Sequence, residues 1–338
     1  MGDSHDFFKV VTDSVPESDK NWQRPTDCRE NIKTILCEVN PSEERFNPLK
    51  RPCLGGEEKY ATVFEAVYDS MDDVNKNMFC SLRRIFIERN FYATGYASII
   101  HHQMGDNEEL NILPGAVLGV RKSILEATPS HLNWLSWKEQ KNFVQIDEEF
   151  LVPLQYPVFE STNPVKLLED VVAHEFGHLF DFANKINDEQ VGDESCYEKD
   201  ETKEDYDYYR ECKPFMPSGT WGAISWKDSR TVLPEKEVVG YRKLCFYDCK
   251  DHMTSTEMVA FYRGLADSDF VSSYALSNPT EDFAESWARR WMLNSGKNLS
   301  VKVSADFTYS IKDIYNSKKF EAKRQYIKKF LQGEILYP

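Results

Sequence analysis

The sequence predicts an α+β fold, with a small mixed sheet and a long buried helix in an upper lobe and a mainly helical lower lobe. Two short runs predict the strands of the sheet: residues 81–89 and 116–120 are both rich in aliphatic and β-branched residues. A third observation predicts the long helix, because apolar residues recur at helical spacing over 164–183. The same spacing over 279–291 and 313–332 predicts helices in the lower lobe.

These elements fall into three expected parts along the chain. Residues 1–57 are polar and contain several prolines, which indicates an extended N-terminal arm held in place by cysteines. Residues 58–300 are expected to form one main domain, which starts with a helix over 58–75. An insertion over 188–250 interrupts this domain. Residues 301–338 are expected to form a C-terminal helical segment docked on the surface.

The first part of the insertion, residues 188–211, is strongly acidic, with tyrosines between its charged residues. Acidic runs of this kind are usually solvated loops, and this is our first interpretation. Two other roles stay open: a calcium-binding loop, and an acidic rim that attracts basic substrates. The sequence contains no EF-hand pattern.

The centre of the long predicted helix carries the pentad His-Glu-Phe-Gly-His, which begins at His174. His174 and His178 are four residues apart, so on a helix both imidazoles lie on one face and can reach one metal ion. Glu175 lies beside them, where its carboxylate could take a proton from metal-bound water. Asn163 as the N-cap and Pro164 at the first helical position support the helix. The alternative is a pair of ordinary core histidines.

A catalytic zinc needs a third protein ligand and keeps its fourth position for water or substrate. The pattern HExxHxxGxxH is excluded, because Asp181 and Asn184 occupy its glycine and third histidine positions. The second predicted helix, which starts at Pro279, supplies another solution. Glu281 and Glu285 lie one turn apart on one face of it, so either glutamate could be the third ligand.

The eight cysteines form two groups of four, one on each side of the predicted metal-binding helix. Their even number and their positions outside both motifs predict local disulfides, and hence a secreted or periplasmic protein. A cytoplasmic protein with free thiols is the alternative. Spacing cannot give the pairing, and a structural metal site at Cys245, Cys249 and His252 is a rival interpretation. The cysteines are Cys28, Cys37, Cys53, Cys80, Cys196, Cys212, Cys245 and Cys249.

Composition argues against several classes of partner. The net charge of −15 argues against a nucleic acid, because phosphate binding needs a clustered basic surface. No apolar run approaches the ~20 residues that cross a bilayer, so we expect no membrane span. The first ten residues have neither the basic nor the apolar region of a signal peptide. We expect a monomer.

Taken together, two blocks of sequence, roughly 168–184 and 272–291, resemble a known family. They are similar to the gluzincin zinc metallopeptidases of the anthrax lethal factor and Pro-Pro endopeptidase group. The shared features are the HEFGH pentad and the later pattern Tyr-Ala-x-x-Asn-x-x-Glu-x-Phe-Ala-Glu, which begins at Tyr274. The resemblance implies a zincin-like metallopeptidase fold. The interval between the two blocks is longer here than in that group, so the resemblance carries no substrate specificity.

The resemblance also assigns roles. Glu281 is the seventh residue after Tyr274, so it becomes the third ligand of a single catalytic zinc, beside His174 and His178. Glu285 then steadies a histidine or the fold without binding the metal, and the alternative is that Glu285 itself is the third ligand. From its position alone, Asp181 could accept a hydrogen bond from a ligand imidazole or from a nearby backbone amide, or could be an exposed helix-end carboxylate.

The expected activity is zinc-dependent hydrolysis of peptide bonds by an endopeptidase, with a peptide or protein as substrate. Glu175 would act as general base toward water and then pass the proton to the leaving amine. The resemblance implies that Tyr274 donates to the developing oxyanion, and the alternative is that Tyr274 is an ordinary buried aromatic. In this class an edge strand beside the cleft pairs with the substrate, and residues 116–124 are our candidate. The alternatives are a zinc hydrolase acting on peptidoglycan peptides and a catalytically idle binding module.

Overall fold

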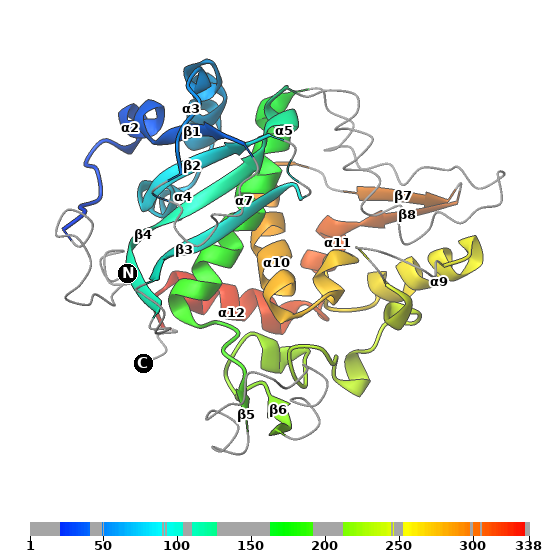
Figure 1. Ribbon diagram of the computed structural model, residues 1–338. Helices are drawn as coiled ribbons and strands as arrows, with labels where there is room; N and C mark the ends of the chain where they lie inside the picture. The colour runs from blue at the N-terminus through cyan, green and yellow to red at the C-terminus, as the bar shows by residue number, and fades with distance from the viewer. Residues whose placement is uncertain are drawn as a thin grey trace.

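The computed structural model describes residues 21–40, 49, 51–89, 91, 93–103, 110–126, 163–191, 212–244, 246, 253–297, 300–304 and 306–334. These residues form a mixed α+β structure with one small sheet and several helices, as the sequence predicted (Figure 1). No helix in these ranges is long and apolar enough to cross a membrane.

The main sheet has four strands in the order β1-β2-β4-β3. Strands β1 (Leu36–Val39), β2 (Leu82–Glu88) and β4 (Leu110–Arg121) are parallel, and β3 (Gly95–Gln103) runs antiparallel to β4 at the edge. The strands predicted over 81–89 and 116–120 are therefore present as β2 and part of β4.

The predicted edge strand over 116–124 is wrong. Residues up to Arg121 belong to β4, which lies between β2 and β3, and helix α5 (Lys122–Glu126) follows directly. The edge strands of the sheet are β1 and β3, and β3 is the one that lies beside α7. The cause is visible in the run Ala116-Val117-Leu118, all of it buried, which is typical of a strand covered on both faces.

Helices cover one face of this sheet. The long helix α7 (Pro164–Asn184) crosses it beside β3 and β4, with α3 (Ala61–Asp69), α4 (Asp73–Cys80) and α5 next to it (Figure 1). The predicted helix over 58–75 is thus divided into the 3-10 helix η3 (Glu57–Tyr60), α3 and the start of α4. The opposite face holds a smaller core made of Cys37, Val39, Phe86, Ile100, Leu113 and Val117.

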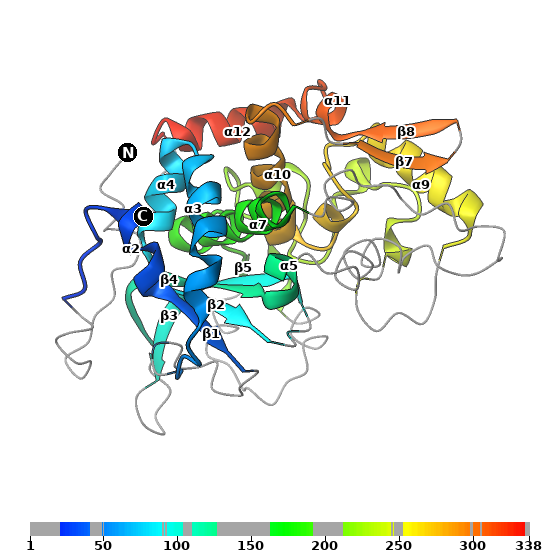
Figure 2. The ribbon, with the colours of Figure 1, turned by 90° about the horizontal axis from the view of Figure 1, so that it is seen from above.

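Figure 2 shows the layers from above, with the sheet, α7, α10 (Pro279–Asn294) and α12 (Glu321–Leu331) stacked in that order. Residues 301–338 were expected to be helical, but this stretch begins with a hairpin. It is followed by α11 and α12. The other elements of the second half are β5 (Gln190–Val191), β6 (Pro214–Phe215), η6 (Gly222–Ile224), η7 (Pro234–Lys236), η8 (Tyr241–Lys243), α9 (Ser255–Ala266), η9 (Tyr274–Leu276), β7 (Ser300–Ser304), β8 (Phe307–Ser310) and α11 (Ile311–Tyr315).

The expected extended arm over residues 1–57 is wrong for residues 28–39, which form helix α2 (Cys28–Ile35) and strand β1. Asp27 caps α2 by accepting a hydrogen bond from the Glu30 amide, and the buried face of α2 comprises Cys28, Ile32 and Ile35. The helical spacing of these three apolar residues is short, and the polar residues around them outweighed it in the sequence. The remaining domain boundaries stay predictions.

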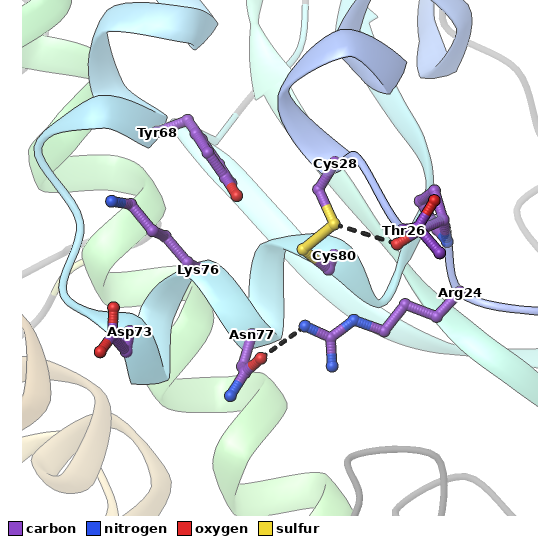
Figure 3. Close-up of a pocket in the computed structure, with 9 residues that line it drawn as sticks. Arg24, Thr26, Cys28, Tyr68, Asp73, Lys76, Asn77 and Cys80 are labelled. Carbon is purple, nitrogen blue, oxygen red and sulfur yellow. Dashed lines mark hydrogen bonds between the residues drawn. A yellow bond between two sulfur atoms is a disulfide. The ribbon is translucent and has the colours of Figure 1, made fainter.

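Two disulfides hold this N-terminal part against the sheet. Cys28–Cys80 joins α2 to the end of α4, and Cys37–Cys53 joins β1 to the segment that follows it. Figure 3 shows the first disulfide in the wall of a surface pocket, where Arg24 Nη2 donates to Asn77 Oδ1 at 2.5 Å. Cys212 is also disulfide-bonded, and the described part of the chain holds no free cysteine.

Several sequence predictions fall outside the described residues. They concern Cys196, the metal-site rival at Cys245, Cys249 and His252, and most of the acidic segment 188–211.

Candidate metal centre

Helix α7 brings the two histidines of the pentad to one face, as their spacing predicts. Asn163 Oδ1 accepts a hydrogen bond from the Val165 amide at 2.9 Å, Pro164 occupies the first turn, and the helix ends at Lys185 in the left-handed conformation. The predicted N-cap is therefore confirmed. His174 and His178 have ring centroids 4.8 Å apart.

Helix α10 supplies the facing carboxylate. Asn278 Oδ1 accepts a hydrogen bond from the Glu281 amide at 2.8 Å, and Pro279 stands at the first helical position. This cap fixes Glu281 in the first turn of α10, so that its side chain meets the imidazoles of α7.

Three ligand atoms converge between the two helices. Oε2 of Glu281 lies 3.1 Å from Nε2 of His174 and 3.3 Å from Nε2 of His178, and the two Nε2 atoms are 3.1 Å apart. A zinc ion with bonds of about 2.0–2.1 Å in tetrahedral geometry needs ligand atoms roughly 3.3 Å apart. These three residues could therefore hold one metal ion.

The same cluster contains a buried acceptor that faces the two imidazole nitrogens without a well-formed hydrogen bond. Oε2 of Glu281 is shielded from solvent and has no hydrogen-bond partner of acceptable geometry among the described residues. A buried carboxylate oxygen in this state is costly unless a proton or a cation occupies the space in front of it. The donor set and this orphaned atom both fit a bound metal ion.

Glu285 lies on the far side of His174 from the other ligand atoms. Nδ1 of His174 donates to Oε1 of Glu285 at 2.9 Å, so this carboxylate orients the ring and leaves Nε2 directed at the metal position. Burial lowers the pKa of His174, but the carboxylates of Glu281 and Glu285 outweigh this and raise the pKa to about 10.

Arg289 completes this support and was not predicted from the sequence. Its guanidinium donates to Oε2 of Glu285 at 2.8 Å and to Oδ1 of Asp170 on α7 at 2.7 Å. Burial raises the pKa of Glu285, but the charge of Arg289 and the bond to His174 hold it well below its usual range. The four-residue spacing between Glu285 and Arg289 on α10 was the available signal.

Close contact between α7 and α10 depends on the glycine of the pentad. A Cβ atom added to Gly177 would lie 2.5 Å from the Cα of Ala284, closer than side chains approach backbone atoms. Gly177 and Ala284 therefore allow the two helices to touch, which places Glu281 within reach of both imidazoles.

Glu175 lies against the edge of the sheet. The residue is 6% exposed, and a Cβ atom added to Gly95, the first residue of β3, would lie 3.0 Å from its Oε1. The glutamate beside the metal cluster is thus next to the start of the edge strand.

Tyr274 also lies at the cluster. Its hydroxyl donates to Oε1 of Glu281 at 3.1 Å, and its ring centroid is 5.9 Å from that of His174 and 4.8 Å from that of Phe246. On the other side, the exposed ring of Phe182 stacks on His178 at 5.9 Å. Sequence reasoning missed both phenylalanines, although Phe182 is one turn after His178.

Asp181 was predicted to accept a hydrogen bond either from a ligand imidazole or from a nearby backbone amide, and the first of these predictions is wrong. Its carboxylate accepts hydrogen bonds from the backbone amide and the side-chain amide of Asn187, at 2.9 and 2.8 Å. The chain folds back after α7 ends, and Asn187 then occupies both oxygens. Burial raises the pKa of Asp181 to about 6.

Asp282, the neighbour of Glu281, points away from the cluster into a buried ion pair. Nζ of Lys323 on α12 donates to Oδ2 of Asp282 at 2.6 Å, and both side chains are fully buried. The indole nitrogens of Trp221 and Trp226 donate to the same oxygen at 3.2 and 3.1 Å. Burial raises the pKa of Asp282 to about 6, against the opposing effect of Lys323.

Comparisons with protein-family models, with curated proteins and with solved structures gave no match to this chain. The resemblance to gluzincins therefore rests on the two sequence blocks alone. The geometry of the three ligand atoms is independent of that resemblance.

Proposed function

We propose that this protein is a zinc-dependent endopeptidase of the gluzincin type with a zincin-like fold. The observation that supports it best is the convergence of His174, His178 and Glu281 at 3.1–3.3 Å, with Glu175 next to the first ligand on the same helix. A catalytic zinc with three protein ligands and an adjacent glutamate is the arrangement that metal-assisted peptide hydrolysis requires.

The donor set favours zinc over the common hard cations. Calcium and magnesium prefer oxygen ligands, in higher coordination number, whereas two imidazoles with one carboxylate are an established catalytic zinc set. When bound there, zinc would polarise the scissile carbonyl and make a water molecule acidic near neutral pH.

The residues of this chain then have separate tasks. Glu175 accepts the proton of the attacking water and later delivers it to the leaving amine nitrogen. Glu285, held by Arg289, keeps His174 in the tautomer that leaves Nε2 free to bind the metal. Tyr274, whose hydroxyl is now bonded to Glu281, turns to donate to the carbonyl oxygen as negative charge develops on it.

The edge strand β3 provides a place for the substrate backbone. It is the last strand in the sheet order, so its outer side has no strand partner among the described residues. An extended peptide paired with β3 would run past Gly95 and hence past Glu175. The two disulfides favour an oxidising compartment, which agrees with a secreted or periplasmic enzyme.

The proposal is tested by measuring bound zinc and peptide cleavage on the same preparations. We expect about one zinc per chain by elemental analysis, and cleavage of some members of a broad peptide library. Glu175→Gln should keep the zinc and lose cleavage by roughly 10²-fold or more. Glu235→Gln, a surface change at the start of η7, is the matched control and should behave like the parent.

Two results would contradict the proposal. A chain that binds no zinc after incubation with the metal ion has no such centre. A chain that binds zinc but cleaves no peptide is not an endopeptidase, and peptidoglycan peptides would be the next substrates to assay.

A further inference from the structure

A second cavity lies next to the metal centre. It has a volume of about 500 Å³ and is lined by side chains from two separate stretches, 230–246 and 276–277. The first stretch belongs to the long interval between the two metal-binding blocks. The second begins two residues after Tyr274 in the chain. We call this cavity the arginine pocket, after Arg230 and Arg242 in its wall.

Phe246 connects the arginine pocket to the metal centre. Its ring forms part of the pocket wall and also packs edge-on against the ring of Tyr274, with centroids 4.8 Å apart. Tyr274 is in turn 5.9 Å from the ring of His174. An extended peptide covers about 3.3 Å per residue, so about three residues span these two steps.

The charge of the arginine pocket is opposite to that of the chain. The protein has a net charge of −15, yet the pocket lining includes two arginines and no carboxylate. Arg242 pairs with Glu237 outside the lining at 2.5 Å, and their side chains are 72% and 34% exposed. An ion pair this exposed contributes little to stability, so Arg242 can exchange Glu237 for another anion.

The polar groups of the pocket also include an unsatisfied hydroxyl. Ser277 lines the pocket, and its Oγ is shielded from solvent without a hydrogen-bond partner in the described part of the chain. The apolar part of the wall comes from Leu244, Phe246 and Leu276. A group with an aliphatic stem and an anionic head suits this combination.

We propose that the arginine pocket binds a carboxylate of the peptide substrate, within about three residues of the bond that is hydrolysed. The arginines form charge-assisted hydrogen bonds with the carboxylate, and the apolar wall contacts its methylene groups. This inference rests on the proposed peptidase function. The carboxylate has two sources, an internal Asp or Glu side chain or the free C-terminus of a peptide.

The test uses fluorescein-labelled decapeptides that differ only in having Glu or Gln at one position, scanned along the chain. These peptides are C-terminally amidated. A separate set has Gln at every scanned position and a free C-terminal carboxylate. Cleavage by the parent is measured as kcat/KM, and binding to Glu175→Gln is measured by fluorescence anisotropy. We expect Glu to be favoured over Gln at one position by roughly tenfold to hundredfold in both measurements.

Variants test whether the arginine pocket causes the preference for Glu. Arg230→Gln and Arg242→Gln should each reduce the preference for Glu, and the double variant should abolish it. Both side chains are exposed, so unfolding is not expected, and thermal unfolding checks this. Arg29→Gln removes the same charge on α2, in the other lobe, and should keep the preference.

The outcomes separate the two proposals. Cleavage without any preference for a carboxylate, or a preference that survives in the double variant, overturns the arginine pocket and leaves the peptidase standing. Selective binding of Glu peptides with no cleavage by the parent overturns the peptidase function alone. A preference confined to the free C-terminus identifies the chain end as the source of the carboxylate.

Discussion

Gly177 and Ala284 meet at the point where the two helices of the metal centre cross, with no space for a methyl group between them. The distance between α7 and α10 is therefore set at the backbone, one residue before His178 and three residues after Glu281. Because three ligand atoms must stay within about 3.3 Å of one another, a shift of a few tenths of an ångström matters here.

Gly177→Ala should weaken zinc binding at least tenfold and lower the thermal unfolding temperature. This is expected although alanine in a helix is favoured over glycine by about 1 kcal/mol. Gly264→Ala in α9 is the control, because the nearest atoms there are valine methyls at 3.1 and 3.2 Å that can rotate away. Zinc affinity is measured by competition with a chelator. Equal affinities in parent and Gly177→Ala would disprove the role of this contact.

Arg289→Gln should reduce zinc affinity by roughly 10- to 100-fold, because Glu285 and Asp170 lose the charge that holds them. Arg290→Gln is the matched control on the next residue, since Arg290 pairs with Asp72 instead. The control should alter stability and leave zinc affinity unchanged. If both variants bind zinc like the parent, Arg289 has no part in orienting His174.

The sequence predicted the ligand helices well because their signals are local. The caps at Asn163 and Asn278 and the spacing of His174, His178 and Glu281 each lie within a few turns of one helix. Helical geometry then fixes which side chains share a face, whatever the rest of the fold. The resemblance chose Glu281 over Glu285, and the structure places Glu281 in the cluster.

The order of the strands could not be predicted in this way. Whether β4 or β3 forms the edge depends on which of the two pairs with β2, a choice that no pattern within one strand records, and β1 is only four residues long. Phe246 and the arginine pocket were missed for the same reason, since both depend on the packing of distant stretches. Arg289 differs, because its four-residue spacing from Glu285 is a local signal. The disulfide pairing likewise had no local signal.

The apparent affinity for zinc should rise about tenfold per pH unit between pH 6 and 8. In the metal-free protein the pKa of His174 is raised to about 10, so this ring carries a proton throughout that range. Zinc needs the neutral ring and must displace one proton, which becomes easier as pH rises. Isothermal titration in buffers of different ionisation enthalpy measures the proton released. Glu285→Gln should reduce this slope, and a parent affinity that does not change with pH would contradict the prediction.

Lys323→Met should lower the free energy of unfolding by about 3–5 kcal/mol, because it leaves the buried carboxylate of Asp282 without a cation. Denaturant titration followed by tryptophan fluorescence measures this directly. The double variant Lys323→Met with Asp282→Asn should lose clearly less than the single one. Lys319→Met, whose partner Asp267 is 83% exposed, should change stability by less than about 1 kcal/mol. A small effect at Lys323 would show that the pair contributes little.

The ion pair between Lys323 and Asp282 also makes the packing of α10 depend on a residue that is synthesised later than the helix itself. On the ribosome, His174 and His178 emerge first, Glu281 follows much later, and α10 receives its cation only once residue 323 has been made. Until then the buried carboxylate of Asp282 has no cation, so the packed position of α10 is less stable, although its apolar face is already present. The position of Glu281 in the cluster is therefore fully stabilised only after all three candidate ligand residues have been made.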